Sequence, residues 1–214
     1  MKIAIAACFL VGISAYAQDG FIRPEISYTK PTSRNLTFTG TGDSAKLQSA
    51  AGFSIAAGDA YGDQDSHEVS LSIGLASFKT SESQAKVFSY NNVLFSSDTD
   101  SMKVRTIPIL FNYRYHTGVK TSALRFYFGP SFGATLLKRS EALNGINAVG
   151  GGAEAMSVSE SKYPLNWAVS AGAAYRLTNR LKLDAGVRFS ETCSSIWRAH
   201  FETKTLYIAL NTKI

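Results

Sequence analysis

The sequence has no long hydrophobic run, little cysteine and few charges for its length. No apolar stretch reaches the roughly 18 residues that a membrane-spanning helix needs, so a helical membrane protein is excluded. Two cysteines among 214 residues are too few for a fold built on disulfides. Charged residues make up 18% of the chain and aromatic residues 12%, which is too little charge and too much aromatic surface for a disordered chain. The length allows one domain or two small ones.

The N-terminus has the three parts of a secretory signal peptide in the usual order. Lys2 is followed by an apolar run over 3–13, and 14–17 (SAYA) is an A-x-A cleavage site. The alternative is a buried N-terminal strand or helix, which would not need all three parts. We expect a signal peptide over residues 1–17, cut after residue 17, and a mature chain of 18–214. The mature chain keeps one thiol, Cys193, which has no internal disulfide partner.

Bulky apolar residues alternate with small or polar residues through most of the mature chain. In 163–177, Leu165, Trp167 and Val169 fall on one face of an extended segment, and Asn166 falls on the other. A period of two predicts β-strands, and it recurs in about eight segments close to the length of a tilted membrane strand. The expected strands are 20–30, 49–58, 66–79, 102–116, 122–137, 163–177, 180–190 and 203–214.

Two further features decide the architecture, because a secreted β-sandwich or a lipocalin-like barrel would alternate as well. The less bulky faces, as in 52–56 and 70–76, are rich in Gly, Ala and Ser, whereas a water-facing sheet would carry Lys, Glu and Thr. The connections also alternate between long and short, as they do in outer-membrane barrels with long surface loops and short periplasmic turns. The expected connections are 31–48, 59–65, 80–101, 117–121, 138–162, 178–179 and a moderate 191–202. The sequence therefore predicts an all-β fold, a closed up-and-down antiparallel transmembrane β-barrel.

Outward-facing aromatic residues are expected to form two rings, one at each membrane interface. The ring near the short turns comprises Tyr113, Tyr115, Phe126 and Tyr175, and the ring near the long loops comprises Tyr28, Trp167 and Phe189. Two prolines, Pro108 and Pro130, fall inside strands, where each removes a ladder N–H. We expect a β-bulge at both.

Three segments resemble a known family. The segments 106–115 (TIPILFNYRY), 126–136 (FYFGPSFGATL) and 172–190 (GAAYRLTNRLKLDAGVRFS) look like strand–turn–strand segments of the outer-membrane β-barrel superfamily of small porin-like proteins. That group is similar to OmpX and to the transmembrane domain of OmpA. The resemblance implies a Gram-negative outer-membrane location, insertion by the barrel-assembly machinery, and no catalytic residue. Such barrels usually end in an aromatic residue that this machinery reads, and Ile214 departs from that pattern.

Eight charged residues of the expected strands point inward by their parity, all in the half nearer the short turns. They are Arg23, Glu25, Glu68, Arg114, Arg125, Arg176, Lys182 and Asp184. Buried charges must be paired, so we expect a salt-bridged cluster. An eight-stranded barrel has room inside only for side chains, so this cluster would fill the lumen. Because positive charges outnumber negative ones, the alternative is a narrow ion or small-solute channel with some anion preference.

Six basic residues share the parity of the lipid-facing residues and lie just past the membrane at the long-loop end. They are Lys30, Lys79, Lys103, Arg105, Lys138 and Lys204. We expect a cationic collar that contacts lipopolysaccharide phosphates in the outer leaflet. The alternative is ordinary solvated charge.

A lipid-modifying enzyme would need a nucleophile, a base and an orienting acid near the outer leaflet. His67 and His116 fall at the periplasmic turns, which leaves His200 as the candidate base. The residues around it that could complete a catalytic set are Ser194, Ser195 and Glu202. Their spacing matches no known motif, so we expect the protein not to be an enzyme.

Other chemistry finds no support in the sequence. Metal-ligand spacing is absent, and the glycines at 150–152 lack the Lys-Ser/Thr that follows in a phosphate-binding loop, so no cofactor is expected. The net charge of +6 does not indicate nucleic acid, because the long loops mix charges of both signs. The predicted protein is a non-enzymatic outer-membrane barrel in contact with lipid and lipopolysaccharide. Its expected role is structural, adhesive or interactive, with a surface ligand bound by the long loops at 31–48, 80–101 and 138–162.

Overall fold

The computed structural model describes residues 20–32, 36–38, 43–45, 47–79, 86–90, 93–97, 103–147, 153–194 and 199–214. The expected signal peptide, residues 1–17, lies outside this part of the chain. Among the described residues, no helix has the length and hydrophobicity needed to cross a membrane.

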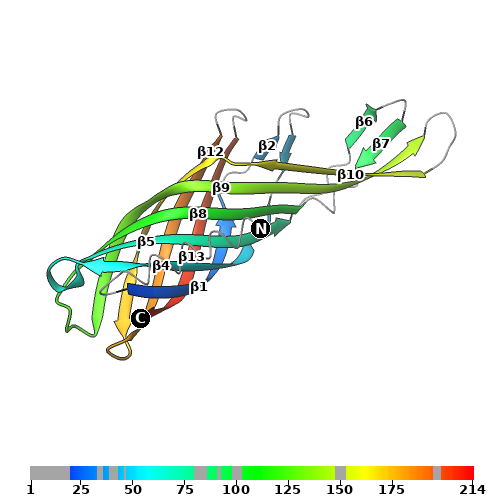
Figure 1. Ribbon diagram of the computed structural model, residues 1–214. Helices are drawn as coiled ribbons and strands as arrows, with labels where there is room; N and C mark the ends of the chain where they lie inside the picture. Colours follow the sequence, from blue (N-terminus) through cyan, green and yellow to red (C-terminus); the bar gives the residue numbers. More distant parts are fainter. Residues whose placement is uncertain are drawn as a thin grey trace.

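Eight long strands form a closed antiparallel barrel in the part of the chain that the structure describes (Figure 1). They are β1 (Gly20–Pro31), β4 (Ala50–Tyr61), β5 (His67–Lys79), β8 (Lys103–His116), β9 (Leu124–Asn147), β11 (Leu165–Arg176), β12 (Leu181–Ser194) and β13 (Ala199–Lys213). Each strand pairs with its neighbours in the order β11-β12-β13-β1-β4-β5-β8-β9, and β9 pairs with β11 to close the ring. No barrel strand is left with an unpaired edge in the membrane, which a spanning sheet requires. The predicted closed up-and-down barrel is confirmed.

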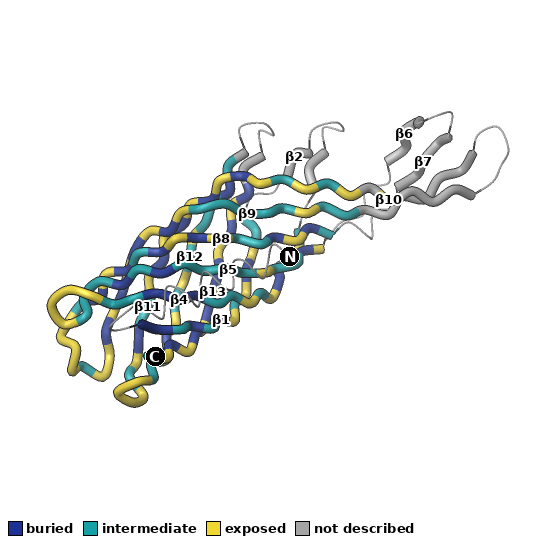
Figure 2. The backbone as a smooth tube through the Cα atoms, viewed as in Figure 1, coloured by how far each residue is buried: buried dark blue, intermediate teal, exposed yellow. Residues whose placement is uncertain are grey.

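Buried and exposed residues alternate along much of the barrel wall (Figure 2), because successive side chains of a strand point to opposite faces. Positions such as Tyr127 and Ala168 are buried inside, whereas large apolar side chains outside remain uncovered. Phe132 is 63% exposed and Leu165 73% exposed. So continuous an apolar surface would be unfavourable in water, but it is favourable against the hydrocarbon chains of a bilayer.

Three short turns connect the strands at one end, which we call the periplasmic end. The first contains the 3-10 helix η1 (Asp63–Asp65), and the others join β8 to β9 and β11 to β12. The C-terminus lies at this end as well, where the amide of Ile214 donates to the carbonyl oxygen of Gly20. The opposite end, with the longer connections, is the surface end.

The expectation that 138–162 is a loop is wrong. Strand β9 continues to Asn147 and pairs there with β10 (Ala153–Lys162) and with β7 (Val93–Ser97), which in turn pairs with β6 (Lys86–Tyr90). The apolar alternation of 122–137 ends before Lys138, but both faces of a sheet outside the membrane meet water and accept polar side chains. The expected loop 31–48 likewise contains a small hairpin, β2 (Leu36–Phe38) with β3 (Asp43–Ala45).

The expected bulges at Pro108 and Pro130 are not found in the described strands. The register between β8 and β9 has the same offset on both sides of Pro108, from Lys103↔Ser140 to His116↔Tyr127. The register of β11 with β9 is equally continuous at Val169↔Pro130. The strands therefore tolerate the missing N–H without inserting a residue.

Candidate functional site

A network of four charged side chains fills the lower lumen, and we call it the charge plug: Arg23, Glu68, Arg114 and Asp184. Arg23 donates to the carboxylate of Glu68, and Arg114 Nη1 lies 3.2 Å from Asp184 Oδ2. Two longer contacts of 3.9 Å, Arg23 to Asp184 and Arg114 to Glu68, cross-link these pairs. All four side chains are buried, with two positive charges balanced by two negative ones. Such balance is what permits charges inside a narrow, low-dielectric lumen.

Two tyrosines pack against the charge plug. The Tyr127 hydroxyl donates to the Tyr207 hydroxyl at 2.9 Å, and the Arg114 guanidinium lies over the Tyr127 ring, 4.4 Å from its centroid. The sequence pattern identified Tyr127 and Tyr207 only as strand residues, although their positions in the alternation place both side chains inside the barrel.

A second ion pair, Glu25 with Arg188, lies beside the plug. Arg188 donates twice to the Glu25 carboxylate, at 3.0 and 2.8 Å, in a bidentate arrangement. The Arg188 guanidinium also lies 4.7 Å from the Tyr207 ring centroid, which joins this pair to the charge plug. Arg188 was missed in the sequence, although it lies inward by parity in the expected strand 180–190.

His116 belongs to the lumen and is not just a turn residue. It ends β8, is buried, and places Nε2 3.4 Å from Glu68 Oε2. His67, by contrast, faces outward near the periplasmic turns, where its Nδ1 lies 2.7 Å from the Tyr113 hydroxyl. The register explains the difference, since His67 pairs with the outward Tyr115, whereas His116 pairs with the inward Tyr127.

Above the plug the lumen contains a small hydroxyl-lined cavity of about 80 Å³, which Glu25 and Arg188 border from below. The residues that give it polar walls include Thr29, Thr106, Thr135, Asn166, Ser190, Thr203 and Thr205. The Oδ1 of Asn166 is buried there without a protein partner, so water is the fitting occupant. Toward the surface end, an apolar cluster of Ala50, Phe78, Val104 and Phe201 covers the cavity. The Phe78 and Phe201 rings meet edge to face with centroids 5.5 Å apart.

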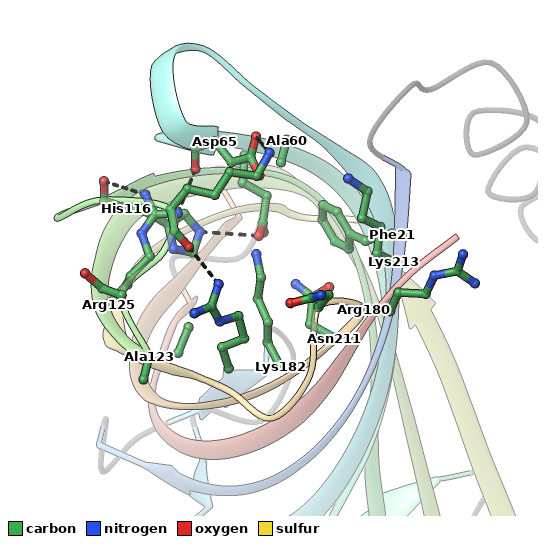
Figure 3. A pocket seen from close by; sticks show the side chains of 16 residues that line it. Phe21, Ala60, Asp65, His116, Ala123, Arg125, Arg180, Lys182, Asn211 and Lys213 are labelled. Carbon is green, nitrogen blue, oxygen red and sulfur yellow. Dashed lines mark hydrogen bonds and ion pairs between the residues drawn. The ribbon is translucent and has the colours of Figure 1, made fainter.

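Three of the eight expected lumen charges lie below the plug, at the periplasmic mouth. Arg125, Arg176 and Lys182 line a pocket of about 210 Å³ enclosed by the three short turns (Figure 3). None of the three forms an ion pair with the charge plug. The predicted single cluster is therefore divided between a plug, a neighbouring pair and a basic mouth.

The six residues of the expected collar lie on the outside of the barrel at the surface end, but they do not form an even ring. Lys79 is directly opposite Lys103, and Arg105 is directly opposite Lys138, on the adjacent strands β5, β8 and β9. We call these four residues the basic patch.

The other two collar residues lie apart from the basic patch, on β1 and β13. Lys30 is directly opposite Lys204, whose ammonium lies 5.8 Å from the Phe189 ring centroid. The exposed Glu202 faces outward next to Lys204 on the same strand. This side of the barrel is therefore less basic than the side that carries the basic patch.

The candidate hydrolytic residues are only partly described. His200 pairs with Cys193, and Glu202 pairs with Glu191, on β13 and β12. Ser195 lies outside the described residues, as do the side chains of Ser194 and His200. The thiol of Cys193 is half-buried and donates to Glu191 Oε1 at 3.4 Å.

An eight-stranded closed barrel with a charged, filled lumen and an apolar outer face has the architecture of a small bacterial outer-membrane β-barrel protein. The outer membrane is the environment that this surface requires.

Solved structures of such proteins share this fold. Neisserial surface protein A is similar with a TM-score of 0.54 and 17% sequence identity, over 91% of this chain and 97% of that one. The outer membrane protein OprG from Pseudomonas aeruginosa is similar with a TM-score of 0.52 and 12% identity, over 92% of this chain and 96% of that one. No protein-family model matches the sequence, and no curated protein matches it significantly. At these identities the likeness establishes the fold.

Proposed function

We propose that this outer-membrane barrel is a non-enzymatic binding protein, which acts through the sheet that rises from its surface end. The observation that carries this proposal is the length of β9, whose 24 residues exceed the about 9–11 that cross a membrane. Its outer part forms a sheet with β10, β7 and β6 beyond the barrel, visible at the right of Figure 1.

The protruding sheet offers backbone groups to a partner. Among the described strands, β6 pairs only with β7, and β10 pairs only with β9, so each leaves one edge without a strand partner. Such edges bind extended peptide segments by strand addition. A surface protein of a host, of another cell or of the same envelope is the class of ligand that this geometry favours.

The closed lumen supports binding over transport. A solute would have to pass the apolar cluster around Phe78 and Phe201 and then the charge plug, and both fill the barrel interior. Separating the ion pairs of the plug within the lumen would leave buried charges without partners, which is strongly unfavourable.

Conductance in planar bilayers tests the closed lumen directly. Refolded protein is expected to insert without steady current, and Phe78→Ala with Phe201→Ala is expected to stay silent because the charge plug remains. Discrete, salt-dependent openings of the unmodified protein that change with Arg125→Ala would contradict the proposal and establish a channel.

Adhesion of cells that display the protein tests the protruding sheet. Cells with the full chain are expected to adhere to epithelial monolayers or to one another, whereas cells with the sheet shortened by replacing 141–158 are expected not to. Equal adhesion by both, at equal surface amounts, would show that the sheet is not the binding element.

We further propose that the basic patch holds the barrel against lipopolysaccharide. Like charges directly opposite each other on neighbouring strands are destabilising, and none of the four residues pairs with an acidic residue in the described chain. The phosphates of lipopolysaccharide lie at this level of the outer leaflet and would neutralise the patch.

Lipopolysaccharide co-purification tests the basic patch. Changing Lys79, Lys103, Arg105 and Lys138 together to Gln is expected to reduce the lipopolysaccharide bound per barrel several-fold, whereas Lys30→Gln with Lys204→Gln is expected to have a smaller effect. An unchanged amount in the fourfold variant would overturn the assignment.

A further inference from the structure

The pocket at the periplasmic mouth has features of a binding site that neither the protruding sheet nor the basic patch explains. It has a volume of about 210 Å³, and its walls come from all three short turns and from the ends of β1 and β13. Glu68 and His116, at the lower surface of the charge plug, form its inner end. The charge plug therefore bounds the pocket toward the membrane, and residues of the periplasmic turns surround it (Figure 3).

The charge of the pocket is strongly unbalanced. Among the described residues, two carboxylates line it, Asp65 and Glu68. Asp65 pairs with Lys120 at 2.8 Å, and Glu68 pairs with Arg23. The cationic lining residues are Lys120, Arg125, Arg176, Arg180, Lys182 and Lys213.

Two arginines are held in the pocket wall by hydrogen bonds to neutral groups, and neither forms an ion pair with another described residue. Arg125 donates to three backbone carbonyl oxygens, those of Thr117, Asp65 and His116, at 3.2 to 3.4 Å. Arg176 donates to the carbonyl oxygens of Lys120 and Thr121 in the same turn. Carbonyl acceptors fix the position of a guanidinium, but they do not neutralise it.

Lys182 supplies the third cation. It lies on the inward face of β12, and Figure 3 shows its side chain directed into the pocket, whereas Arg180 points away from it. Lys182 has no hydrogen bond or ion pair with any other described residue. A half-buried lysine with no partner among the described residues, in one pocket with two fixed guanidinium groups, is an arrangement that an oxyanion would complete.

We infer that the periplasmic mouth is a binding site for a phosphate group, held by Lys182 with Arg125 and Arg176. Three cations that line one pocket favour a doubly charged oxyanion over a monovalent one. A cation would be repelled, and duplex nucleic acid is too wide to enter the pocket. The phosphate group can belong to a soluble periplasmic anion or to an anionic phospholipid headgroup of the inner leaflet, and the experiment separates these sources.

Calorimetric titration with inorganic pyrophosphate tests the site, on full-length mature protein refolded in a neutral detergent at low salt. Saturable binding is expected, and Lys182→Gln is expected to weaken it by at least about tenfold, because a charge-assisted hydrogen bond is lost. Lys182→Arg is expected to retain the site, because it keeps the charge. The control variant has all four basic-patch residues changed to Gln, and it is expected to bind at the periplasmic mouth as the unmodified protein does.

The outcomes separate the possibilities. No saturable binding, or equal weakening by Lys182→Gln and by the basic-patch variant, would overturn the inference. In nanodiscs, the pyrophosphate affinity is compared between phosphatidylglycerol and phosphatidylcholine alone. A lower affinity with phosphatidylglycerol, and no such difference between the lipids in Lys182→Gln, identifies a lipid headgroup as the natural ligand. An affinity that does not depend on the lipid identifies a soluble phosphate. None of these results depends on whether the protruding sheet binds a surface partner.

Discussion

At the scale of single residues, the Glu25–Arg188 pair shows how buried charge is accommodated in the barrel. Glu25 is 4% exposed, and its two carboxylate oxygens both accept from Arg188. Because the pair is electroneutral and doubly hydrogen-bonded, its desolvation is offset by mutual attraction.

Removing one partner of this pair is expected to destabilise the barrel more than removing both. Arg188→Leu leaves Glu25 buried without a bidentate partner and is expected to lower the free energy of unfolding by about 3–5 kcal/mol. Adding Glu25→Gln to Arg188→Leu should recover much of that loss. Urea unfolding in lipid vesicles measures both, with the exposed Arg180→Leu as the control. A loss no larger than that of the control would contradict this account of the pair.

Glycine at position 186 leaves room for two tyrosine hydroxyls and a backbone oxygen. A Cβ at Gly186 would lie 2.6 Å from the Tyr127 hydroxyl oxygen, 2.7 Å from the backbone oxygen of Ala171 and 2.8 Å from the Tyr207 hydroxyl oxygen. Gly186→Ala is therefore expected to lower the free energy of unfolding by about 1–3 kcal/mol through overpacking. The same substitution should be less harmful when Tyr127 and Tyr207 are both Phe, because two of the three atoms that obstruct the new methyl are then absent. An equal loss in the two backgrounds would point to the backbone as the obstacle.

At the scale of elements, β9 combines a membrane strand and a surface strand in one segment. Its first part pairs with β8 and β11 in the barrel wall, and its last part pairs with β10 and β7. The barrel closes through the first part alone. The outer part is therefore expected to be dispensable for folding.

Shortening the β9–β10 hairpin tests this separation. Ser140 is directly opposite Ser159, so replacing 141–158 with Asn-Gly should close the hairpin with a two-residue turn of a favoured type. The shortened barrel is expected to refold into vesicles and to unfold in urea within about 1 kcal/mol of the full chain. The electrophoretic shift between heated and unheated samples verifies folding. Failure to refold would show that the outer sheet contributes to barrel formation.

At the scale of the whole molecule, the barrel has its polar residues inside and its apolar residues outside, which is the reverse of a soluble protein. This reversal shows that the outer surface of the barrel faces the lipid. The destabilisation caused by a new charge on that surface should therefore depend on how deep in the bilayer the charge lies. Val169 lies outward near the middle of β11, and Leu165 lies outward at its surface end.

Arginine at these two positions should distinguish the centre of the membrane from its edge. Val169→Arg is expected to lower the free energy of unfolding by about 2–4 kcal/mol, and Leu165→Arg by about 0–1 kcal/mol. Urea unfolding in vesicles of one lipid composition gives the comparison. Equal losses at both positions would contradict the membrane depths that we assign to Val169 and Leu165.

The sequence by itself determined the barrel, because a period of two and alternating connection lengths are local properties of the chain. The position of a residue in the alternating pattern determines which face of the strand it occupies. Asp184 and Arg114 could therefore be placed inside the barrel without knowing which strands are neighbours. The same parity placed Lys79 and Lys138 outside. Strand ends were less predictable, because Lys138 and Arg139 look like loop residues until the pairing partner is known.

Only the tertiary structure decided which of these residues meet. Glu25 and Arg188 are 163 positions apart, and the register and tilt of the strands bring them together. The same geometry separated Lys182 from the charge plug and left it in the periplasmic mouth. It also set Lys79 opposite Lys103 and so turned an expected ring of charge into a patch. Local patterns fix the face of a strand, whereas shear and closure, which involve all eight strands at once, fix the partners across the lumen.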